Sequence, residues 1–369
     1  MQESSRSANT NLPVICFVNT TQAWGGGEKW HYDMALMLKE KGYPVLTITS
    51  QESALQKKLL EANIFNKTFH ISNVSFLNPF TRKKLVSYFK ENSVDVVIMN
   101  LPSDLKTAGA AAKSAGISKI IYRRGSAIPV KNSFLNRYLY RKVIDLVLVN
   151  SKATKNTILS KNRKLIPEEK IRVLYNGLHL KNYGCKDKPR EQNHPIVIGN
   201  LGRFVKQKGQ HRFIEIAKKL KEKNIPFKII LGGEGELKPA ISKKIKSEGL
   251  QACFELPGFI TDTRQFMEQI DVFVLTSYWE GFGYVLAEAM ACCKPVIGFN
   301  VSSNPELIRD GQNGFLIEDG DTGSLAGKIE YLYSNPAEIQ NLGKQGRRMA
   351  EQDFEISQVR HQLIHILEQ

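Results

Sequence analysis

Short apolar runs alternate with amphipathic stretches along the whole chain. In the first half, apolar runs typical of buried parallel strands occupy residues 13–19, 44–49, 95–99, 119–122, 147–150 and 172–175. A second series occupies residues 196–200, 227–231, 254–256 and 271–275. Helical periodicity follows several of these runs, over residues 29–39, 211–221 and 285–291. This alternation predicts an α/β protein with parallel sheets.

A polar segment divides the two series of runs. Residues 181–194 hold few apolar side chains and include Gly184 and Pro189, a composition typical of linkers. The length of 369 residues also favours two domains. We therefore expect one domain over residues 1–183 and a second over residues 184–353.

The most informative stretch begins where the apolar run 271–275 ends. A loop with Gly281 and Gly283 leads from it into the helical pattern 285–291. Backbone amides at the start of such a helix favour an anion, and the carboxylates of Glu280 and Glu288 can accept hydrogen bonds from hydroxyl groups. The stretch therefore suits a ligand with a diphosphate and sugar hydroxyls. The alternative is a tight turn with two solvated glutamates.

The same stretch resembles a family signature. Glu280 and Glu288, with Gly281-Phe282-Gly283 between them and Glu-Ala-Met-Ala at residues 288–291, are similar to the motif of the retaining glycosyltransferases of family four. The similarity continues over residues 294–297, 305–308 and 313–316. It implies the GT-B fold, in which two Rossmann-like, doubly wound parallel-sheet domains face each other across a cleft. It also implies that a helix over residues 354–369 packs back on the first domain.

The chain departs from the family pattern at two places. Cys293 stands where the family usually has glycine, and Ser302-Ser303 stand where a glycine pair is usual. The second departure lies in a loop that the resemblance places near the donor sugar, so the identity of the sugar stays open.

Two cations follow the apolar run 196–200. Arg203 offers a guanidinium fork and Lys208 a point charge, and both suit a diphosphate. The resemblance makes them the groups that stabilise the leaving group, and it makes Glu280 the residue that holds the donor sugar. The alternative is a pair of solvated surface cations.

The resemblance also implies a set of donor-binding residues. Gly26 and Gly27 would approach the donor phosphates, although the glycines could simply form a flexible turn, and Glu288 would bind the ribose. The set comprises Gly26, Gly27, Gly258, Ile260, Phe282, Gly283, Tyr284, Val285 and Glu288. A nicotinamide site would need a G-x-G-x-x-G sequence at the first glycine loop, and that sequence is absent there.

Charge is distributed unevenly along the chain. Of 52 Lys and Arg and 36 Asp and Glu residues, 28 and 12 respectively lie at or before Gly184, so the first half carries the whole net charge of +16. Such asymmetry favours an anionic partner, either lipid headgroups or nucleic acid. We expect no nucleic acid, because no recognition motif is present.

Two basic, aromatic stretches could contact a membrane surface. They contribute Arg82, Lys83 and Lys84 in residues 80–89, and Phe134, Arg137, Tyr138, Arg141 and Lys142 in residues 131–142. The alternative is a pair of ordinary domain helices with solvated basic faces.

Arg123 and Arg124 follow the apolar run 119–122, where they could bind an anion on the acceptor side or could be surface charges.

Few other signals bear on cofactors or location. Asp319 and Asp321 form a D-x-D sequence that we interpret as turn chemistry, and we expect neither a metal nor a cofactor. The five cysteines show no metal-type spacing, so reduced thiols are expected. Residues 1–12 lack a signal-peptide core, and no apolar run could span a bilayer. These features predict a cytoplasmic protein with peripheral contact at the inner face of the membrane.

The expected function is transfer of a sugar, with retention, from a nucleoside diphosphate donor to a glycan or lipid-linked acceptor in surface polysaccharide or lipopolysaccharide synthesis. A UDP-sugar is the expected co-substrate, with GDP- and ADP-sugars as alternatives. Another reading is a GT-B epimerase or hydrolase that acts on a sugar nucleotide without a glycan acceptor.

Overall fold

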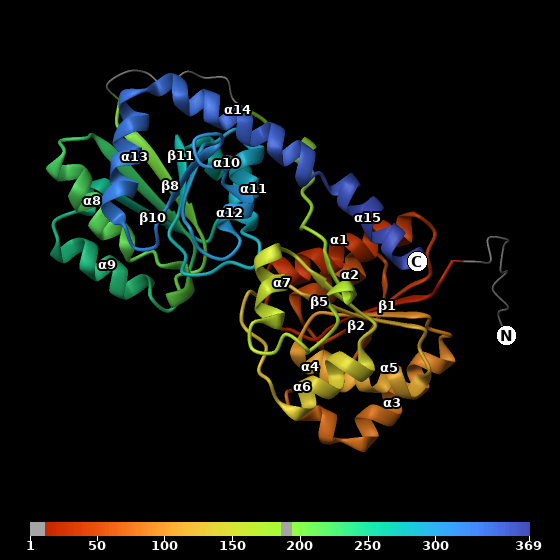
Figure 1. Ribbon diagram of the computed structural model, residues 1–369. Coiled ribbons are helices and arrows are strands. Elements are labelled where there is room, and N and C mark those ends of the chain that lie inside the picture. The colour runs from red at the N-terminus through yellow and green to blue at the C-terminus, as the bar shows by residue number, and fades with distance from the viewer. Residues whose placement is uncertain (1–11, 186–193) are drawn as a thin grey trace. The chain divides into compact units, whose positions relative to one another are not determined.

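The computed structural model describes residues 12–185 and 194–369. The chain divides into two compact units (Figure 1). Unit 1 comprises residues up to Asn150, Thr154–Leu174 and Gln362–Gln369, and unit 2 comprises Ser151–Ala153 and Tyr175–His361. The units separate after Leu174, earlier in the chain than the expected boundary at 183/184, because Leu178 and Leu180 pack in a core cluster of unit 2. Of the expected linker, residues 186–193 lie outside the described residues, as do residues 1–11 at the start of the chain.

Unit 1 contains a seven-stranded parallel sheet of order β3-β2-β1-β4-β5-β6-β7. Its strands are β1 (Ile15–Asn19), β2 (Val45–Thr49), β3 (Phe65–Thr68), β4 (Val96–Met99), β5 (Lys119–Arg124), β6 (Leu146–Val149) and β7 (Ile171–Val173). The central strands are buried on both faces, which explains their continuous apolar sequences.

Helices cover both faces of this sheet (Figure 1). The helices of the first half are α1 (Gly26–Glu40), α2 (Ala54–Glu61), α3 (Pro79–Glu91), α4 (Pro102–Asp104), α5 (Ala110–Ala115), α6 (Phe134–Tyr138) and α7 (Lys152–Leu159). Helices α1 and α2 lie on one face, and α3, α5 and α6 lie on the other. The basic stretch 131–142 contains the short helix α6, which a π-helical turn at Leu139–Val143 follows.

Unit 2 contains a six-stranded parallel sheet of order β10-β9-β8-β11-β12-β13. Its strands are β8 (Ile196–Leu201), β9 (Phe227–Gly232), β10 (Phe254–Gly258), β11 (Val272–Leu275), β12 (Val296–Phe299) and β13 (Gly314–Ile317). Its helices are α8 (Arg212–Glu222), α9 (Lys238–Ser247), α10 (Thr263–Glu268), α11 (Tyr284–Ala291), α12 (Asn304–Leu307), α13 (Thr322–Ser334) and α14 (Pro336–Asp353). Two doubly wound parallel sheets confirm the predicted α/β class.

The last helix, α15 (Ile356–Glu368), is shared between the units. Its final residues, 362–369, cluster with unit 1. There the Tyr43 hydroxyl donates to Glu368 at 3.1 Å, and the Lys119 ammonium donates to the carbonyl of Ile366 at 2.9 Å. No helix in the described residues is long and apolar enough to cross a membrane.

The expectation of reduced thiols is wrong for two of the cysteines. Cys185 and Cys293 form a disulfide with their Cα atoms 5.2 Å apart, whereas Cys16, Cys253 and Cys292 are free. The two partners are 108 residues apart in sequence, so their spacing gave no sign of the pairing. The disulfide ties the segment before the undescribed residues to the end of α11.

Candidate active site

The carboxyl ends of the strands of unit 2 carry the predicted catalytic residues on two adjoining loops. One loop follows β8 and holds Arg203 and Lys208, and the other follows β11 and holds Glu280. The amide of Tyr278 donates to the carbonyl of Gln207 at 2.8 Å, and the Gln207 side chain donates to the carbonyl of Trp279 at 2.9 Å. These bonds fix one loop against the other.

Gly209 allows this close approach. Its φ is +63°, and a Cβ at this position would lie 2.3 Å from the carbonyl oxygen of Thr276. The Thr276 hydroxyl in turn donates to the carbonyl of Lys208 at 3.1 Å. Any larger residue at position 209 would separate the loops and displace Lys208.

Lys208 and Glu280 meet directly. The Lys208 Nζ lies 2.6 Å from the Glu280 Oε1, and the Ser277 hydroxyl donates to the same oxygen at 2.6 Å. Glu280 is 5% exposed, so these two partners replace water in stabilising its buried carboxylate. The alternative of solvated groups at these two positions is therefore wrong.

Arg203 differs from Lys208. Its side chain is exposed, and its guanidinium forms no hydrogen bond or ion pair with any described residue. Its backbone carbonyl accepts hydrogen bonds from the Gln210 side chain at 3.0 Å and from the amide of Val205 at 2.9 Å. Arg203 thus stands on an anchored backbone with its guanidinium available to a ligand.

Helix α11 begins at Gly283, which has φ +86° and offers no side chain to cap the first amides. Tyr284 and Val285, two of the predicted donor-binding residues, supply those amides and are half-buried. Such amides carry the positive end of the helix dipole. Phe282 has a core side chain that packs against Tyr175, Tyr284 and Phe354, so only its backbone could contact a ligand.

Glu288 lies one turn into α11 and is nearly buried. The Tyr183 hydroxyl donates to its Oε1 at 3.1 Å. Burial, together with the charge of Glu288, raises the pKa of Tyr183, so this hydroxyl keeps its proton and remains a donor. Sequence reasoning missed Tyr183, because nothing in the segment before the linker distinguishes it.

Gly258 and Ile260 lie at the end of β10. The amide of Gly233 donates to the carbonyl of Gly258 at 2.7 Å, and Gly258 has φ +88°. The side chain of Ile260 packs against Gly232, at the end of β9. The strand ends thus form a tight glycine-rich edge, with the Phe259 ring beside it 74% exposed.

The serines that replace the usual glycine pair have distinct roles. Ser302 has φ +48°, a conformation that glycine adopts more readily, and Ser303 donates to the backbone carbonyl of Glu280 at 3.3 Å.

The D-x-D residues, Asp319 and Asp321, bind other parts of unit 2. Asp321 caps α13 by accepting from the amide of Ser324 at 2.9 Å, and Asp319 pairs with Arg212 at 2.8 Å. The expected turn chemistry is therefore confirmed for Asp321, whereas Asp319 forms an ion pair with a distant residue.

In unit 1, Gly26 and Gly27 form the first turn of α1, next to a polar network. The Oε1 of Glu28 accepts from the amides of Asn19 and Asn100, both at 3.2 Å. A Cβ on Gly27 would lie 2.7 Å from the Asn100 amide nitrogen, so glycine makes room for this network. The network joins the carboxyl ends of β1 and β4, the edge where parallel sheets bind ligands.

Arg123 and Arg124 belong to β5 rather than following it, and they are only 4% and 9% exposed. Arg123 donates to Asn100 at 3.1 Å and lies over the Trp30 ring at 5.1 Å, and Arg124 donates to the carbonyl of Ile128. The alternative of solvated surface charges is therefore wrong for both.

Two buried titratable groups support this edge. Burial and the nearby Arg123 lower the pKa of His31, which packs against Phe17 and Trp30 and stays neutral. Burial raises the pKa of Asp104 to about 7, although it accepts hydrogen bonds from the hydroxyl of Thr20 and the amide of Leu101.

Most of the residues predicted to face a membrane are exposed. On α3, Arg82, Lys83 and Lys84 are exposed, and Arg82 donates to Ser114. Around α6, Phe134 and Tyr138 are 79% and 47% exposed. Arg137 is half-buried and donates to Asn132, Arg141 donates to the carbonyl of Lys164 at 2.7 Å, and Lys142 is exposed.

Comparison with known proteins gives a consistent assignment. A relative from Staphylococcus aureus, the capsular polysaccharide biosynthesis glycosyltransferase CapM, is 30% identical over 59% of this chain and 60% of its own length. The N-acetylgalactosamine-N,N'-diacetylbacillosaminyl-diphospho-undecaprenol 4-alpha-N-acetylgalactosaminyltransferase of Campylobacter jejuni is 31% identical over 56% of this chain and 55% of its own length. The matched stretch thus spans little more than half of each relative.

A crystal structure of Anabaena Alr3699/HepE in complex with UDP and glucose matches with a TM-score of 0.83 and 23% identity, and covers 96% of this chain and 99% of that one. This similarity shows the fold. Family models match both halves, Glycosyltransferase Family 4 over residues 24–182 and Glycosyl transferases group 1 over residues 185–349. The chain therefore belongs to the group 1, family 4 glycosyltransferases and has their GT-B fold.

Proposed function

We propose that this protein transfers a sugar from a nucleoside diphosphate donor to a hydroxyl of a lipid-linked glycan in the synthesis of a surface polysaccharide. The observation that carries the proposal is the Lys208–Glu280 pair beside the uncapped start of α11, with Glu288 one turn further on. This arrangement supplies cations and amides for a diphosphate and carboxylates for hydroxyls. The relatives named for capsular and diphospho-undecaprenol-linked glycans support the choice of acceptor.

In the proposed reaction, the bond between the anomeric carbon and the diphosphate breaks while the acceptor oxygen attacks the same face of the sugar. The acceptor proton passes to a phosphate oxygen of the leaving group. Arg203, Lys208 and the first amides of α11 stabilise the charge that develops on the diphosphate. Glu280 orients the sugar, and Glu288 binds the ribose hydroxyls.

We also propose that the enzyme is independent of metal. The observation behind this is that Asp319 and Asp321 are committed to Arg212 and to the start of α13. Arg203, Lys208 and the first amides of α11 then neutralise the diphosphate in place of a divalent ion.

A donor panel tests the proposal. Thermal unfolding of the full chain is measured with UDP-, GDP- and ADP-sugars, and we expect a UDP-sugar at 100 times its Kd to add about 2.7 kcal/mol of stability. The same donor should give an α-linked product from an α-linked sugar, with activity unchanged in EDTA. Release of free sugar or an epimer without any acceptor would favour the hydrolase or epimerase reading. An inverted product, or loss of activity in EDTA that manganese restores, would contradict the mechanism.

The surface of unit 1 supports peripheral contact with an anionic membrane. Helices α3 and α6 lie on the same face of the sheet (Figure 1). They carry Phe80 and Phe134, which are 75% and 79% exposed, and exposed lysines occur in the same two stretches. Exposed aromatic rings beside basic side chains are typical of interfacial binding.

Cosedimentation with phosphatidylglycerol vesicles tests this contact. We expect binding at low salt that weakens at high salt, and a several-fold loss in Phe80→Ser/Phe134→Ser, because two interfacial rings are removed. Phe259→Ser is the matched control, since Phe259 is equally exposed but lies in unit 2. Equal loss in the control, or no binding of the wild type at low salt, would contradict the membrane assignment.

A further inference from the structure

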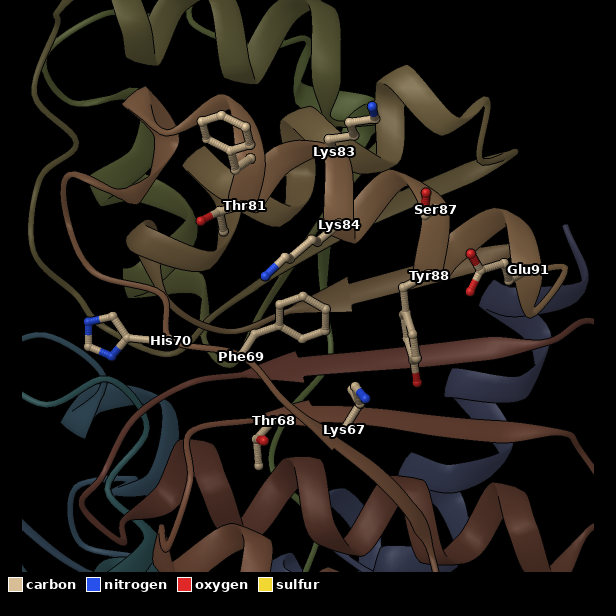
Figure 2. A pocket seen from close by; sticks show the side chains of 11 residues that line it. Lys67, Thr68, Phe69, His70, Thr81, Lys83, Lys84, Ser87, Tyr88 and Glu91 are labelled. Atoms are coloured by element: carbon tan, nitrogen blue, oxygen red, sulfur yellow. The ribbon is translucent and has the colours of Figure 1, made fainter.

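A hollow of unit 1 lies between α3 and the edge strand β3, outside the network around Glu28. It is a groove of about 760 Å³ (Figure 2). A smaller hollow of about 260 Å³ adjoins it and shares Thr68, Phe69 and His70. Gln22, Ser50 and Gln51, which follow β1 and β2, line the smaller hollow. It therefore opens at the carboxyl ends of the strands, where parallel sheets bind their ligands.

The groove is cationic. Lys67, Lys83, Lys84 and His70 line it against a single carboxylate, Glu91, and none of the three lysines forms an ion pair with a described carboxylate. Figure 2 shows Lys84 extending toward His70 and Phe69, while Lys67 rises from β3 below. Three unpaired ammonium groups in one groove repel one another, and a phosphate would relieve that repulsion.

Aromatic side chains also line the groove. Phe69 and Tyr88 meet edge to face with their centroids 5.9 Å apart. Phe80 lies at the rim, and the segment that leads into α3 carries Leu77 and Val74, which are 70% and 66% exposed. Exposed apolar side chains grouped in this way mark a contact site for an apolar partner.

We propose that the groove binds the acceptor, a glycan joined through a phosphate or diphosphate to an apolar lipid chain. The sugar lies in the polar hollow at the strand ends, Lys67, Lys84 and His70 contact the phosphate, and the lipid follows Phe80 and Leu77 toward the membrane. This assignment rests on the proposed transferase function. It explains why polar, cationic and apolar parts occur together in two adjoining hollows of unit 1.

Soluble analogues test the groove on the full chain. Farnesyl diphosphate is titrated calorimetrically alongside farnesol and inorganic pyrophosphate, and we expect it to bind at least about 10-fold more tightly than either, since each analogue satisfies half of the groove. Lys67→Ala/Lys84→Ala should weaken farnesyl diphosphate about 10- to 100-fold through the loss of two charge-assisted contacts. Lys57→Ala/Lys90→Ala is the charge-matched control and should bind normally, because neither lysine lines the groove.

Binding of UDP is measured on the same variants to separate this inference from the proposed function. We expect it to be unchanged in both double variants. Equal losses in the two variants, pyrophosphate binding as tight as farnesyl diphosphate, or no farnesyl diphosphate binding at all would overturn the groove assignment. So would a Lys67→Ala/Lys84→Ala defect confined to vesicle binding. If the chain binds farnesyl diphosphate but no nucleotide sugar, the groove assignment stands and the proposed transferase function is refuted.

Discussion

Arg203→Ala is expected to lower kcat/KM for sugar transfer by about 10²- to 10³-fold, the usual cost of removing one group that stabilises transition-state charge. Its stability should be close to that of the wild type, because the side chain is exposed and its guanidinium forms no hydrogen bond or ion pair with a described residue. Steady-state kinetics and urea unfolding measure the two quantities. Lys206→Ala is the matched control, since it removes an exposed cation from the same loop.

Lys208→Ala should differ from Arg203→Ala in a diagnostic way. It should lose activity to a similar degree but also lose stability, because Glu280 stays buried and keeps, among the described residues, Ser277 as the hydrogen-bond donor to its carboxylate. Lys208→Ala/Glu280→Gln should regain much of that stability without regaining activity. If Arg203→Ala has wild-type kcat/KM, or if Lys206→Ala is equally impaired, leaving-group stabilisation by this loop is refuted.

Most strands of the sheet centres could be predicted from sequence because they are buried on both faces, although the interior strand β12 was not among the predicted runs. The run 271–275 became β11, and 196–200 became β8, each within one residue. The edge strand β3 was not predicted. Its residues, Phe65–Thr68, alternate between exposed and half-buried positions, so they form no continuous apolar run. That strand forms one wall of the groove, so the groove could not be predicted either.

The site was predictable to the extent that its residues lie within one motif. Glu280 and Glu288 were identified together because only seven residues, which include a glycine loop, separate them. Several hydrogen-bond partners of the candidate site residues come from distant parts of the chain. Tyr183 is 105 residues from Glu288, and Asn100 is 72 residues from Glu28. Such pairs depend on the folded arrangement of loops, and a single sequence does not carry that information.

Glu288→Gln is expected to weaken UDP binding by about 10- to 100-fold, the equivalent of one or two hydrogen bonds to a charged acceptor. The amide keeps an oxygen for the Tyr183 hydroxyl but loses the charge that would hold two ribose hydroxyls. Isothermal titration with UDP and with uridine measures the effect. Both ligands should weaken by a similar factor, because both carry the ribose and only UDP carries the diphosphate.

Tyr183→Phe removes the hydroxyl that donates a hydrogen bond to the Glu288 carboxylate. The Tyr183 hydroxyl fixes the orientation of Glu288 and does not itself bind ribose, so its removal should weaken UDP less than Glu288→Gln does. Glu236→Gln, at an exposed glutamate before α9, is the control and should leave the Kd unchanged. A Glu288→Gln variant that binds uridine normally but UDP poorly would move the role of Glu288 from the ribose to the phosphates. A normal Kd for both ligands would remove Glu288 from the nucleotide site.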